Sequence, residues 1–279
     1  MSLSTLPVFY VDAFTNTQFQ GNPAAVVLLD EWLPDNQLIA IAAEINLSET
    51  AFLVGDHIRW FTPAVEVNLC GHATLAAAFV LNQFRQHPIN PFIFKSLSGE
   101  LTLYKNGSGF TLDFPILNTQ PASIADYPQL ADILGVEIEA LWLAKDRYVC
   151  FLSSPDQVAH CSPNMSALAA LPLPGLTITA ASHEPHIDFV SRYFAPAKGV
   201  DEDPVTGTSH CAIAPLWAAR LNKNQLVGHQ ISARGGVVLC AVEDQRVKLT
   251  GEATLFLTGH IHLWSLIYLP LKYHRCNLF

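Results

Sequence analysis

The sequence RWFTPA at residues 59–64 returns as RYFAPA at residues 192–197. A second pair of stretches follows at nearly the same interval, because SLSGELTL at 96–103 is echoed by SARGGVVL at 232–239. The intervals are 133 residues (from 59 to 192) and 136 residues (from 96 to 232). Two different motifs that recur at almost one interval indicate two homologous halves. A small-molecule site is then expected in the cleft between them.

The bulk composition sets limits on the class of protein. The 279 residues are 50% hydrophobic, which suits two domains of about 130 residues, each with its own core. The net charge of -9 argues against nucleic acid and anionic membranes as partners. The N-terminus lacks the basic region of a signal peptide, and no apolar run reaches the roughly 20 residues of a membrane span. We therefore expect a cytoplasmic protein.

Metal and disulfide chemistry have no sequence signature. The six cysteines form no Cys-x-x-Cys pair, and the chain is too long and too poor in cysteine to need a disulfide framework. His72 and His210 are candidates to share a metal across the repeat, but neither has cysteine or carboxylate ligands at standard spacing. Nucleophile elbows and glycine-rich phosphate loops are also missing from the sequence. We expect no metal.

Each half reads as many short strands around one buried helix. The runs from about 72 to 84 and from about 208 to 221 are almost free of charge, as expected of helices that are buried on all sides. The predicted class is α+β, with each sheet wrapped around its helix. We place the first domain at residues 1–116 and the second at 117–263, with prolines marking a linker near 115–130. The apolar residues 264–279 form an atypical tail.

Glu49 is the first candidate for chemistry. It lies in NLSETAF (46–52), where a predicted helix gives way to an apolar strand. Partial loss of water there would raise the pKa of the carboxyl group toward neutrality, which suits a general acid or base. A solvated glutamate in a turn is the alternative.

His72 and Asp203 stand at the predicted starts of the two central helices. The helix dipole at His72 disfavours the imidazolium form, and a neutral histidine can relay protons. Asp203 lies in DEDPVTG (201–207) and could equally be an ordinary N-terminal cap. By the repeat, Gly207 occupies the place of Gly71. The two helix N-termini would then face each other, and their free amides could hold a carboxylate.

Cys70 also precedes a helix N-terminus, where thiolates are stabilised. A racemase that uses two thiols would need a second cysteine at the matching place, but the segment from Asp203 to Gly207 contains none. Cys211 comes four residues too late. A buried structural cysteine therefore fits Cys70 better than a catalytic thiol.

At these residues the chain resembles the PhzF-like family, which contains the phenazine-biosynthesis isomerase and shares the fold of diaminopimelate epimerase. The matching stretches are VDAFTNTQFQGNPAAVVLL (11–29), NLSETAFL (46–53), RWFTPAVEVNLCGHATLAAA (59–78), RYFAPAKGVDEDPVTGTSHCAIAPLW (192–217) and GEATLFLTGHIHL (251–263). They span most of the chain in the family's order.

The resemblance implies two pseudo-symmetric domains with the site between them, and a cofactor-independent enzyme that is often a homodimer. In the phenazine isomerase, the glutamate that corresponds to Glu49 moves a proton on dihydro-hydroxyanthranilate. His72 and Asp203 match the histidine and the aspartate of the family's motifs. The resemblance implies that Gly71, Gly207 and Thr208 line the substrate site, and we count Cys70 with them as a substrate-binding residue.

The leading hypothesis is thus an isomerase without a cofactor that moves a proton on a small carboxylate-bearing metabolite. Two alternatives remain open. One is a racemase or epimerase assisted by Cys70, which stands where the epimerase relatives keep a catalytic thiol. The other is a non-catalytic module that binds a small molecule. Because the family is functionally mixed, membership does not identify the substrate.

Overall fold

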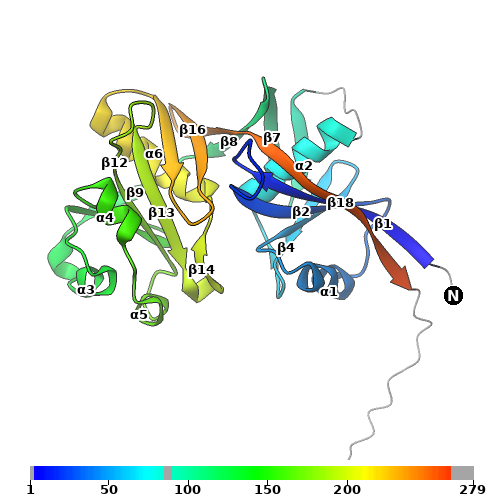
Figure 1. Ribbon diagram of the computed structural model, residues 1–279, viewed down its shortest axis with the longest axis horizontal. Helices are drawn as coiled ribbons and strands as arrows, with labels where there is room; N and C mark the ends of the chain where they lie inside the picture. Colours follow the sequence, from blue (N-terminus) through cyan, green and yellow to red (C-terminus); the bar gives the residue numbers. More distant parts are fainter. Residues whose placement is uncertain (1–2, 85–89, 265–279) are drawn as a thin grey trace, which may run out of the picture.

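The computed structural model describes residues 3–84 and 90–264, and the predicted tail lies outside these residues from position 265 onward. Figure 1 shows two lobes side by side, one built mainly from the first half of the chain and the other mainly from the second. Among the described residues, no helix is long and apolar enough to cross a membrane.

The first half contains strands and helices that alternate irregularly along the chain. In order they are β1 (Leu3–Ala13), β2 (Asn22–Leu29), α1 (Asp35–Ile45), β3 (Thr50–Val54), β4 (His57–Phe61), β5 (Glu66–Val67), α2 (Gly71–Phe84), β6 (Phe92–Ser96), β7 (Gly99–Asn106) and β8 (Gly109–Pro115).

The second half follows the same plan with additional short helices. Its elements are β9 (Thr119–Ala122), η1 (Ile124–Asp126), α3 (Gln129–Leu134), β10 (Ala140–Ala144), β11 (Arg147–Phe151), α4 (Pro155–His160), α5 (Met165–Ala169), β12 (Gly175–Ala181), β13 (Phe189–Ala195), η2 (Pro196–Lys198), β14 (Val200–Asp203), α6 (Gly207–Leu221), β15 (Gln225–Gln230), β16 (Gly236–Glu243), β17 (Arg246–Gly251) and β18 (Ala253–Trp264). The predicted linker near 115–130 was wrong in part, since it holds a paired strand, a 3-10 turn and the start of a helix.

The strand pairing repeats between the halves. In the first half β2 and β3 are parallel, β3 and β4 antiparallel, and β4 and β6 parallel. In the second half β11 and β12 are parallel, β12 and β13 antiparallel, and β13 and β15 parallel. An antiparallel meander then follows in each, β6–β7–β8 and β15–β16–β17. The repeat in the sequence is therefore a repeat in topology.

The halves are joined by strands that cross between them. The last strand of the second half, β18, crosses to the first half and pairs with β1, whereas β9 pairs with β10 within the second half. Strands β8 and β17 pair directly across the junction. The predicted boundary at residues 116 and 117 remains a prediction, but β18 differs from the expected grouping. It was assigned to the second domain and lies in the lobe of the first (Figure 1).

The repeated motif has the same structural role in both halves. The guanidinium of Arg59 donates to both carboxylate oxygens of Glu66 at 2.7 and 2.6 Å, and that of Arg192 donates to Glu202 at 2.7 and 2.9 Å. Each guanidinium also lies over the ring of the phenylalanine two residues further on, at 5.0 and 4.9 Å. These paired contacts tie β4 to β5 and β13 to β14, just before each central helix begins.

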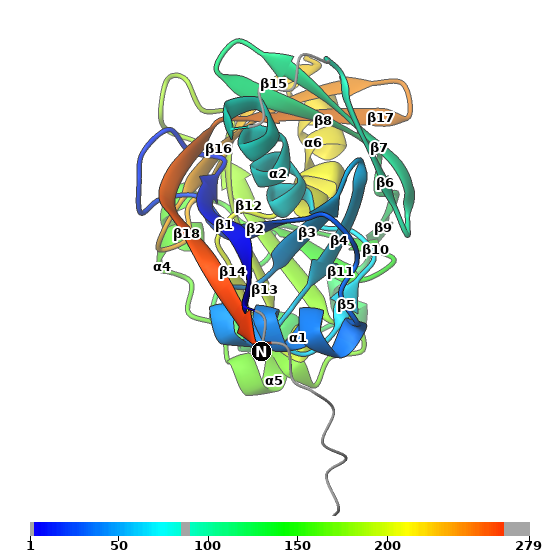
Figure 2. The same cartoon turned by 90° about the vertical axis from the view of Figure 1, so that its right-hand side faces the viewer.

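The central helices α2 and α6 lie inside the curved sheets, and Figure 2 shows α2 in front with α6 beyond it. Residues 71–78 of α2 are all buried, and α6 is buried through most of its first three turns. The near absence of charge in both runs predicted this position correctly. Each helix thus begins deep in the protein, at the junction of the two halves.

The junction between β8 and β17 is tight at Gly109, and this gives a test of the fold. A Cβ at Gly109 would lie 2.8 Å from the backbone carbonyl oxygen of Gly251. We expect Gly109→Ala to lower the free energy of unfolding by about 1–3 kcal/mol, because the strand backbone cannot move aside freely. Gly259→Ala is the matched control, since its Cβ would meet nothing closer than 3.8 Å. Equal urea midpoints for the two variants would contradict this packing.

Candidate active site

The first turns of α2 and α6 meet where the two lobes join. A Cβ placed on Gly71 would lie 4.0 Å from the Cα of Gly207, so the two helix starts approach through their glycines. The free backbone N–H groups at a helix N-terminus favour negative charge. The two helix N-termini therefore lie beside each other, as the sequence predicted, and the binding of an anionic group by their amides stays a prediction.

Glu49 and His72 are in contact at this place. Glu49 lies just before β3, and His72 is the second residue of α2. The Oε2 atom of Glu49 is 3.4 Å from Nε2 of His72, with 22% of the glutamate side chain and 7% of the histidine side chain exposed. A carboxylate and an imidazole in such contact can pass a proton, and the exposed part of Glu49 gives access to it.

Burial shifts the pKa values of Glu49 and His72 in the directions that favour the uncharged form of each group. Loss of water raises the pKa of Glu49, as the sequence predicted for a carboxylate beside an apolar strand. Burial lowers the pKa of His72, although the nearby charge of Asp203 acts in the opposite direction. His72 is thus a neutral imidazole around neutrality, and Glu49 takes up a proton more readily than an exposed glutamate does.

Asp203 ends β14, three residues before the N-cap of α6. Its Oδ1 accepts a hydrogen bond from Asn22 Nδ2 at 2.7 Å, and its Oδ2 accepts one from Thr206 Oγ1 at 2.5 Å. Burial raises the pKa of Asp203, and the hydrogen bonds from Thr206 and Asn22 lower it in part. Since Asp203 influences the pKa of His72 in turn, the three predicted catalytic residues share one electrostatic environment.

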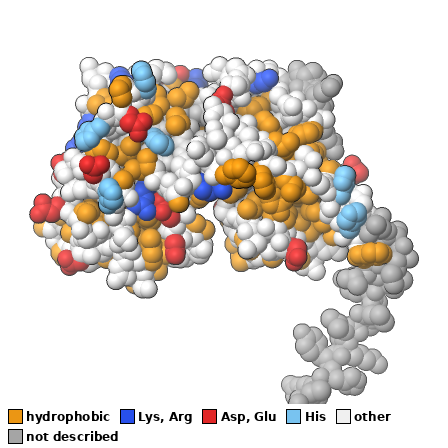
Figure 3. Space-filling view, viewed as in Figure 1, with side chains coloured by type: hydrophobic (Ala, Val, Ile, Leu, Met, Phe, Trp, Pro, Cys, Tyr) orange, Lys and Arg blue, Asp and Glu red, His pale blue; other side chains and the backbone are white. Residues whose placement is uncertain are grey.

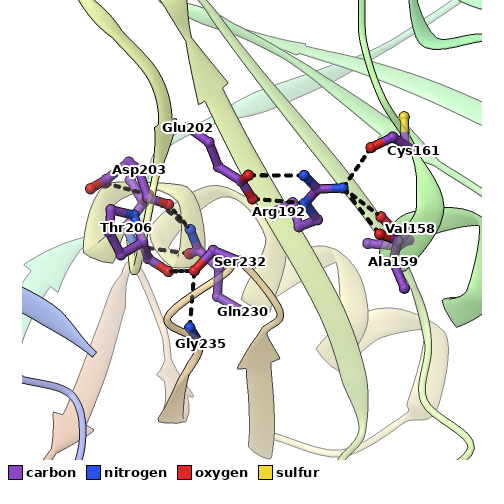
Figure 4. A network of polar contacts seen from close by, with 11 residues as sticks. Val158, Ala159, Cys161, Arg192, Glu202, Asp203, Thr206, Gln230, Ser232 and Gly235 are labelled. Carbon is purple, nitrogen blue, oxygen red and sulfur yellow. Dashed lines mark hydrogen bonds and ion pairs between the residues drawn. The ribbon is translucent and has the colours of Figure 1, made fainter. Parts of the chain in front are cut away.

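Gln230 braces the loop that carries Asp203, as Figure 4 shows. Its side-chain oxygen accepts from the backbone N–H of Thr206 at 2.8 Å, and its Nε2 donates to the backbone oxygen of Asp203 at 2.7 Å. Ser232 adds a hydrogen bond to the carbonyl of Pro204 at 2.8 Å. The loop is therefore held from β15 and the turn after it, while the Arg192–Glu202 pair holds the preceding strand.

Cys70 lies behind the imidazole. Its Sγ is 3.5 Å from Nδ1 of His72 and the residue is 6% exposed. Burial raises the pKa of the Cys70 thiol well above its usual value, and the charges of Glu49 and Asp203 add to the effect. The helix N-terminus does not overcome these effects, so Cys70 is a thiol. The thiol lies close to the imidazole of His72 and also hydrogen-bonds to the carboxyl group of Glu49.

Strand register shows what the second half has at the place of Glu49. Phe61 and Phe194 occupy the same place in the repeated motif. Phe61 pairs with the residue directly after Glu49, and Phe194 pairs with the residue directly after Gly175. Glu49 is thus matched by Gly175, and the second half has no equivalent carboxylate.

Thr208 stands at the place of His72, because each is the residue after the first glycine of its central helix. Its hydroxyl accepts a hydrogen bond from Nη2 of Arg147 at 3.1 Å. Arg147 is 3% exposed, pairs with Asp146 at 2.8 Å, and lies over the ring of Tyr193 at 4.7 Å. Its Nη1 has no hydrogen-bond partner among the residues that the structure describes. A cation therefore stands beside the start of α6.

His210 does not share a site with His72. Its Nδ1 donates to the carbonyl oxygen of Thr206 at 2.9 Å, and burial lowers its pKa to about 4. It is a fully buried histidine that completes the first turn of α6. The expectation that His72 and His210 share no metal stays a prediction.

A separate open cavity of about 710 Å³ lies between the halves. Its lining includes Phe14, Asn106, His229, Arg234 and Thr250, and it includes none of Glu49, His72 and Asp203. The candidate active site is therefore identified by the polar contacts among Glu49, His72 and Asp203 and not by this cavity.

Three supporting residues were not found by sequence reasoning. Asn22 lies in the matching stretch at residues 11–29 but was not singled out, and Gln230 and Arg147 carry no motif. Asn22 is fully buried, which is unusual for an asparagine and shows that its amide is used inside the protein. The role of Asn22 is revealed only by its hydrogen bond to Asp203, which lies 181 residues away in the chain.

Comparison with known proteins identifies the family. The family of phenazine biosynthesis-like proteins matches residues 11–259. The chain belongs to this family. An uncharacterized isomerase of Pseudomonas aeruginosa is 46% identical over 257 residues, covering 91% of this chain and 97% of that protein. This phenazine biosynthesis-like protein is therefore an isomerase in class.

Solved structures support the same assignment. The crystal structure of a PhzF-family phenazine biosynthesis protein from Enterococcus faecalis has a TM-score of 0.89 at 42% identity and covers 93% of this chain and 100% of that one. A hydroxyproline epimerase from Agrobacterium vitis, at 11% identity, has a TM-score of 0.59 over 93% of each chain. The second likeness concerns the fold alone, and it confirms the predicted α+β architecture of the epimerase type.

The burial of Glu49 predicts a gain in stability when its charge is removed. A glutamate with a raised folded-state pKa destabilises the protein increasingly as pH rises from the unfolded-state value of 4.5 through the folded-state value. We expect Glu49→Gln to unfold at a higher urea concentration than wild type at pH 7. The difference should disappear below pH 4.5, where both states are protonated. A variant less stable at pH 7 would contradict the assigned direction.

Proposed function

We propose that this protein is a cofactor-independent isomerase that moves a proton on a small carboxylate-bearing metabolite. The observation that carries the proposal is the buried contact between Glu49 and His72 beside two opposed helix N-termini. General acid–base groups and amide dipoles suffice for such a reaction, so no cofactor is part of it.

Glu49 acts as the base. Its carboxylate takes a proton from a carbon next to a carboxyl-bearing or unsaturated centre, and the electron pair delocalises toward the substrate oxygen. The backbone amides at the starts of α2 and α6 stabilise the negative charge that develops there. The protonated Glu49, or His72 beside it, then returns the proton to another carbon. The product is an isomer, and the enzyme recovers its original protonation state.

Asp203 orients rather than transfers the proton in this scheme. Both of its oxygens already accept hydrogen bonds from Asn22 and Thr206. Its charge stands near His72 and favours any imidazolium that forms transiently. The loop through Thr206 also fixes the start of α6, and with it the amides that would hold the substrate carboxylate.

The exposed surface supports a homodimer, which we also propose. Figure 3 shows hydrophobic side chains gathered over the lobe that contains β1 and β18. Large exposed side chains there include Phe19, Phe256 and Leu257, exposed by 67%, 49% and 43%. Contiguous apolar surface of this kind is typical of a protein interface.

Solvent deuterium uptake tests the role of Glu49. Dihydro-hydroxyanthranilate and other small unsaturated carboxylates are incubated in D₂O, and exchange at carbon is followed by NMR. Glu49→Gln should lose at least about 100-fold in exchange rate, because it lacks the base. Glu44→Gln, an exposed glutamate on α1, is the matched control and should exchange like wild type. Unchanged exchange in Glu49→Gln would exclude the proposed base.

The pH profile gives a second test. The rate constant kcat/KM should rise with pH as Glu49 ionises, and the midpoint of this limb should lie above 4.5 because burial raises the pKa of Glu49. The limb should be absent from the residual activity of Glu49→Gln. A midpoint at or below 4.5 would show that an exposed carboxylate governs the reaction instead.

The contact between Cys70 and His72 keeps a thiol-assisted racemase as the second candidate. Cys70→Ala separates the two. If the thiol only orients the imidazole, exchange should fall by no more than about tenfold, roughly the loss expected on removing one orienting hydrogen bond. If Cys70 is the acid or base, exchange should fall as far as in Glu49→Gln. Binding of acids without exchange in wild type would instead identify a non-catalytic module.

A further inference from the structure

Arg147 is a buried cation beside the start of α6. It is 3% exposed, and its Nε and Nη2 atoms donate to the carboxylate of Asp146 at 2.8 and 2.9 Å. Its Nη2 atom also donates to the hydroxyl oxygen of Thr208 at 3.1 Å. Taking a guanidinium out of water is costly, and a buried ion pair is weak evidence of a gain in stability. A role in the neighbouring site is therefore a better account of Arg147 than stability of the fold.

The contact with Arg147 leaves the hydroxyl proton of Thr208 unused. Arginine has hydrogen-bond donors and no acceptor, so the Thr208 oxygen can only accept in this contact. Among the residues that the structure describes, the hydroxyl of Thr208 donates to no other group. Thr208 is partly exposed and directly follows Gly207, which approaches Gly71 where the two helices begin. A free O–H donor therefore stands at the junction of the helix starts.

The surroundings of Arg147 carry a net positive charge. Lys198 donates to Asp146 at 3.0 Å, so this one carboxylate is shared by two cations. Burial acts to raise the pKa of Asp146, but the contacts with Arg147 and Lys198 lower it to about 2. Asp146 is thus ionised at neutral pH, and two cations against one carboxylate leave a single positive charge. An anion at the first turn of α6 is attracted by this charge as well as by the free amides of the helix.

The two helix starts differ in the charge beside them. At the start of α2 the carboxylate of Glu49 lies 3.4 Å from His72, and it repels an anion when it is ionised. Asp203 is near the start of α6, but burial raises its pKa, and its two oxygens already accept hydrogen bonds from Asn22 and Thr206. The start of α6, with a positive charge behind it, is therefore the better place for the carboxylate of a substrate.

We propose that Arg147 is a positioning residue, which holds Thr208 so that the Thr208 hydroxyl donates to the substrate carboxylate at the start of α6. Arg147 is too deeply buried to touch the substrate, and it acts by fixing the Thr208 oxygen and by its charge. This role rests on the proposed function, and it adds a basis for selecting carboxylates over neutral amides. With the carboxylate held at α6, the reacting carbon is left to Glu49 of the first half.

Binding of a matched acid and amide to the full-length protein tests this role. Benzoate, a small unsaturated carboxylate, is titrated by calorimetry, and benzamide is its neutral counterpart. Thr208→Val and Arg147→Met should each raise the Kd for benzoate by about tenfold or more, as expected on losing a hydrogen bond to a charged group, and leave the Kd for benzamide unchanged. Thr208→Ser should bind like wild type. A wild-type Kd for benzoate in Thr208→Val or in Arg147→Met overturns the proposal.

The double variant separates positioning from packing. Because Arg147 acts through Thr208, the Arg147→Met and Thr208→Val changes together should weaken binding about as much as the more severe single change, whereas independent effects would multiply. Arg147→Lys keeps the charge but not the planar fork, so its Kd should fall between wild type and Arg147→Met. For an acid that exchanges deuterium, KM should rise and kcat should change little. Losses that multiply, or a fall in kcat at unchanged KM, contradict positioning through Thr208.

Arg59→Met controls for the loss of a partly buried ion pair. Arg59 also donates twice to one carboxylate, that of Glu66, and it also lies over an aromatic ring, but these partners belong to the first half. Arg59→Met should lower the thermal midpoint and keep the wild-type Kd for benzoate. If Arg147→Met does not fold, Thr208→Val and Arg147→Lys decide, since neither removes a charge. Equal weakening in Arg59→Met would show a general loss of structure and overturn the role of Arg147.

The carboxylate site and the reaction are scored separately. If the variants weaken benzoate binding as expected but wild type exchanges deuterium with no acid, the proposed isomerase fails and the role of Arg147 in binding stands. If exchange depends on Glu49 but none of the variants changes Kd or KM, the role of Arg147 is wrong and the isomerase stands. A wild type that does not bind benzoate also counts against the carboxylate site.

Discussion

The hydrogen bond from Asn22 to Asp203 is the contact on which the site depends. It joins the start of β2 in one half to the end of β14 in the other, and the same amide donates to the carbonyl of Val205 at 2.9 Å. Asn22 is fully buried, so these bonds are made away from water, where an unmet donor is costly. They hold the loop before α6 against the first half, and so bring Gly207 opposite Gly71.

Glu49 is largely buried and has no cationic partner among the described residues, and this makes it the candidate acid–base group of the site. A carboxylate paired with arginine, such as Glu66 with Arg59 or Glu202 with Arg192, has its charge balanced by the guanidinium and serves the fold. Among the described residues Glu49 has no arginine or lysine partner; it lies beside the neutral imidazole of His72, and burial raises its pKa although hydrogen bonds with Ser48 and Cys70 act in the opposite direction. The structural carboxylates Glu66 and Glu202 are thus distinguished from the candidate catalytic carboxylate Glu49 by their partner and not by their depth of burial.

The sequence predicted the parts of the structure that repeat or follow a local pattern. The motifs at 59–64 and 192–197 revealed the two halves, and the lack of charge in the helical runs revealed their buried centres. The alternation of apolar and polar residues along a strand does not say which strand it pairs with, so the pairing of β18 with β1 in the other half was not predicted. Asn22 and Gln230 were missed for a similar reason, because their partners are far away in the chain and only the folded backbone brings them together.

The repeat favours a proton shift over the inversion of a centre as the reaction that we propose. Where the first half has Glu49 and His72, the second has Gly175 and Thr208, and the nearby charge is the guanidinium of Arg147. An enzyme that inverts a centre needs a proton donor on one face of the carbon and an acceptor on the other. Here Glu49 and His72 both come from the first half, and the corresponding place in the second half has the start of α6 and Arg147, which is paired with Asp146. We therefore expect such a site to remove and return the proton on the same face, which would move it along a substrate whose carboxylate is held by the helix amides.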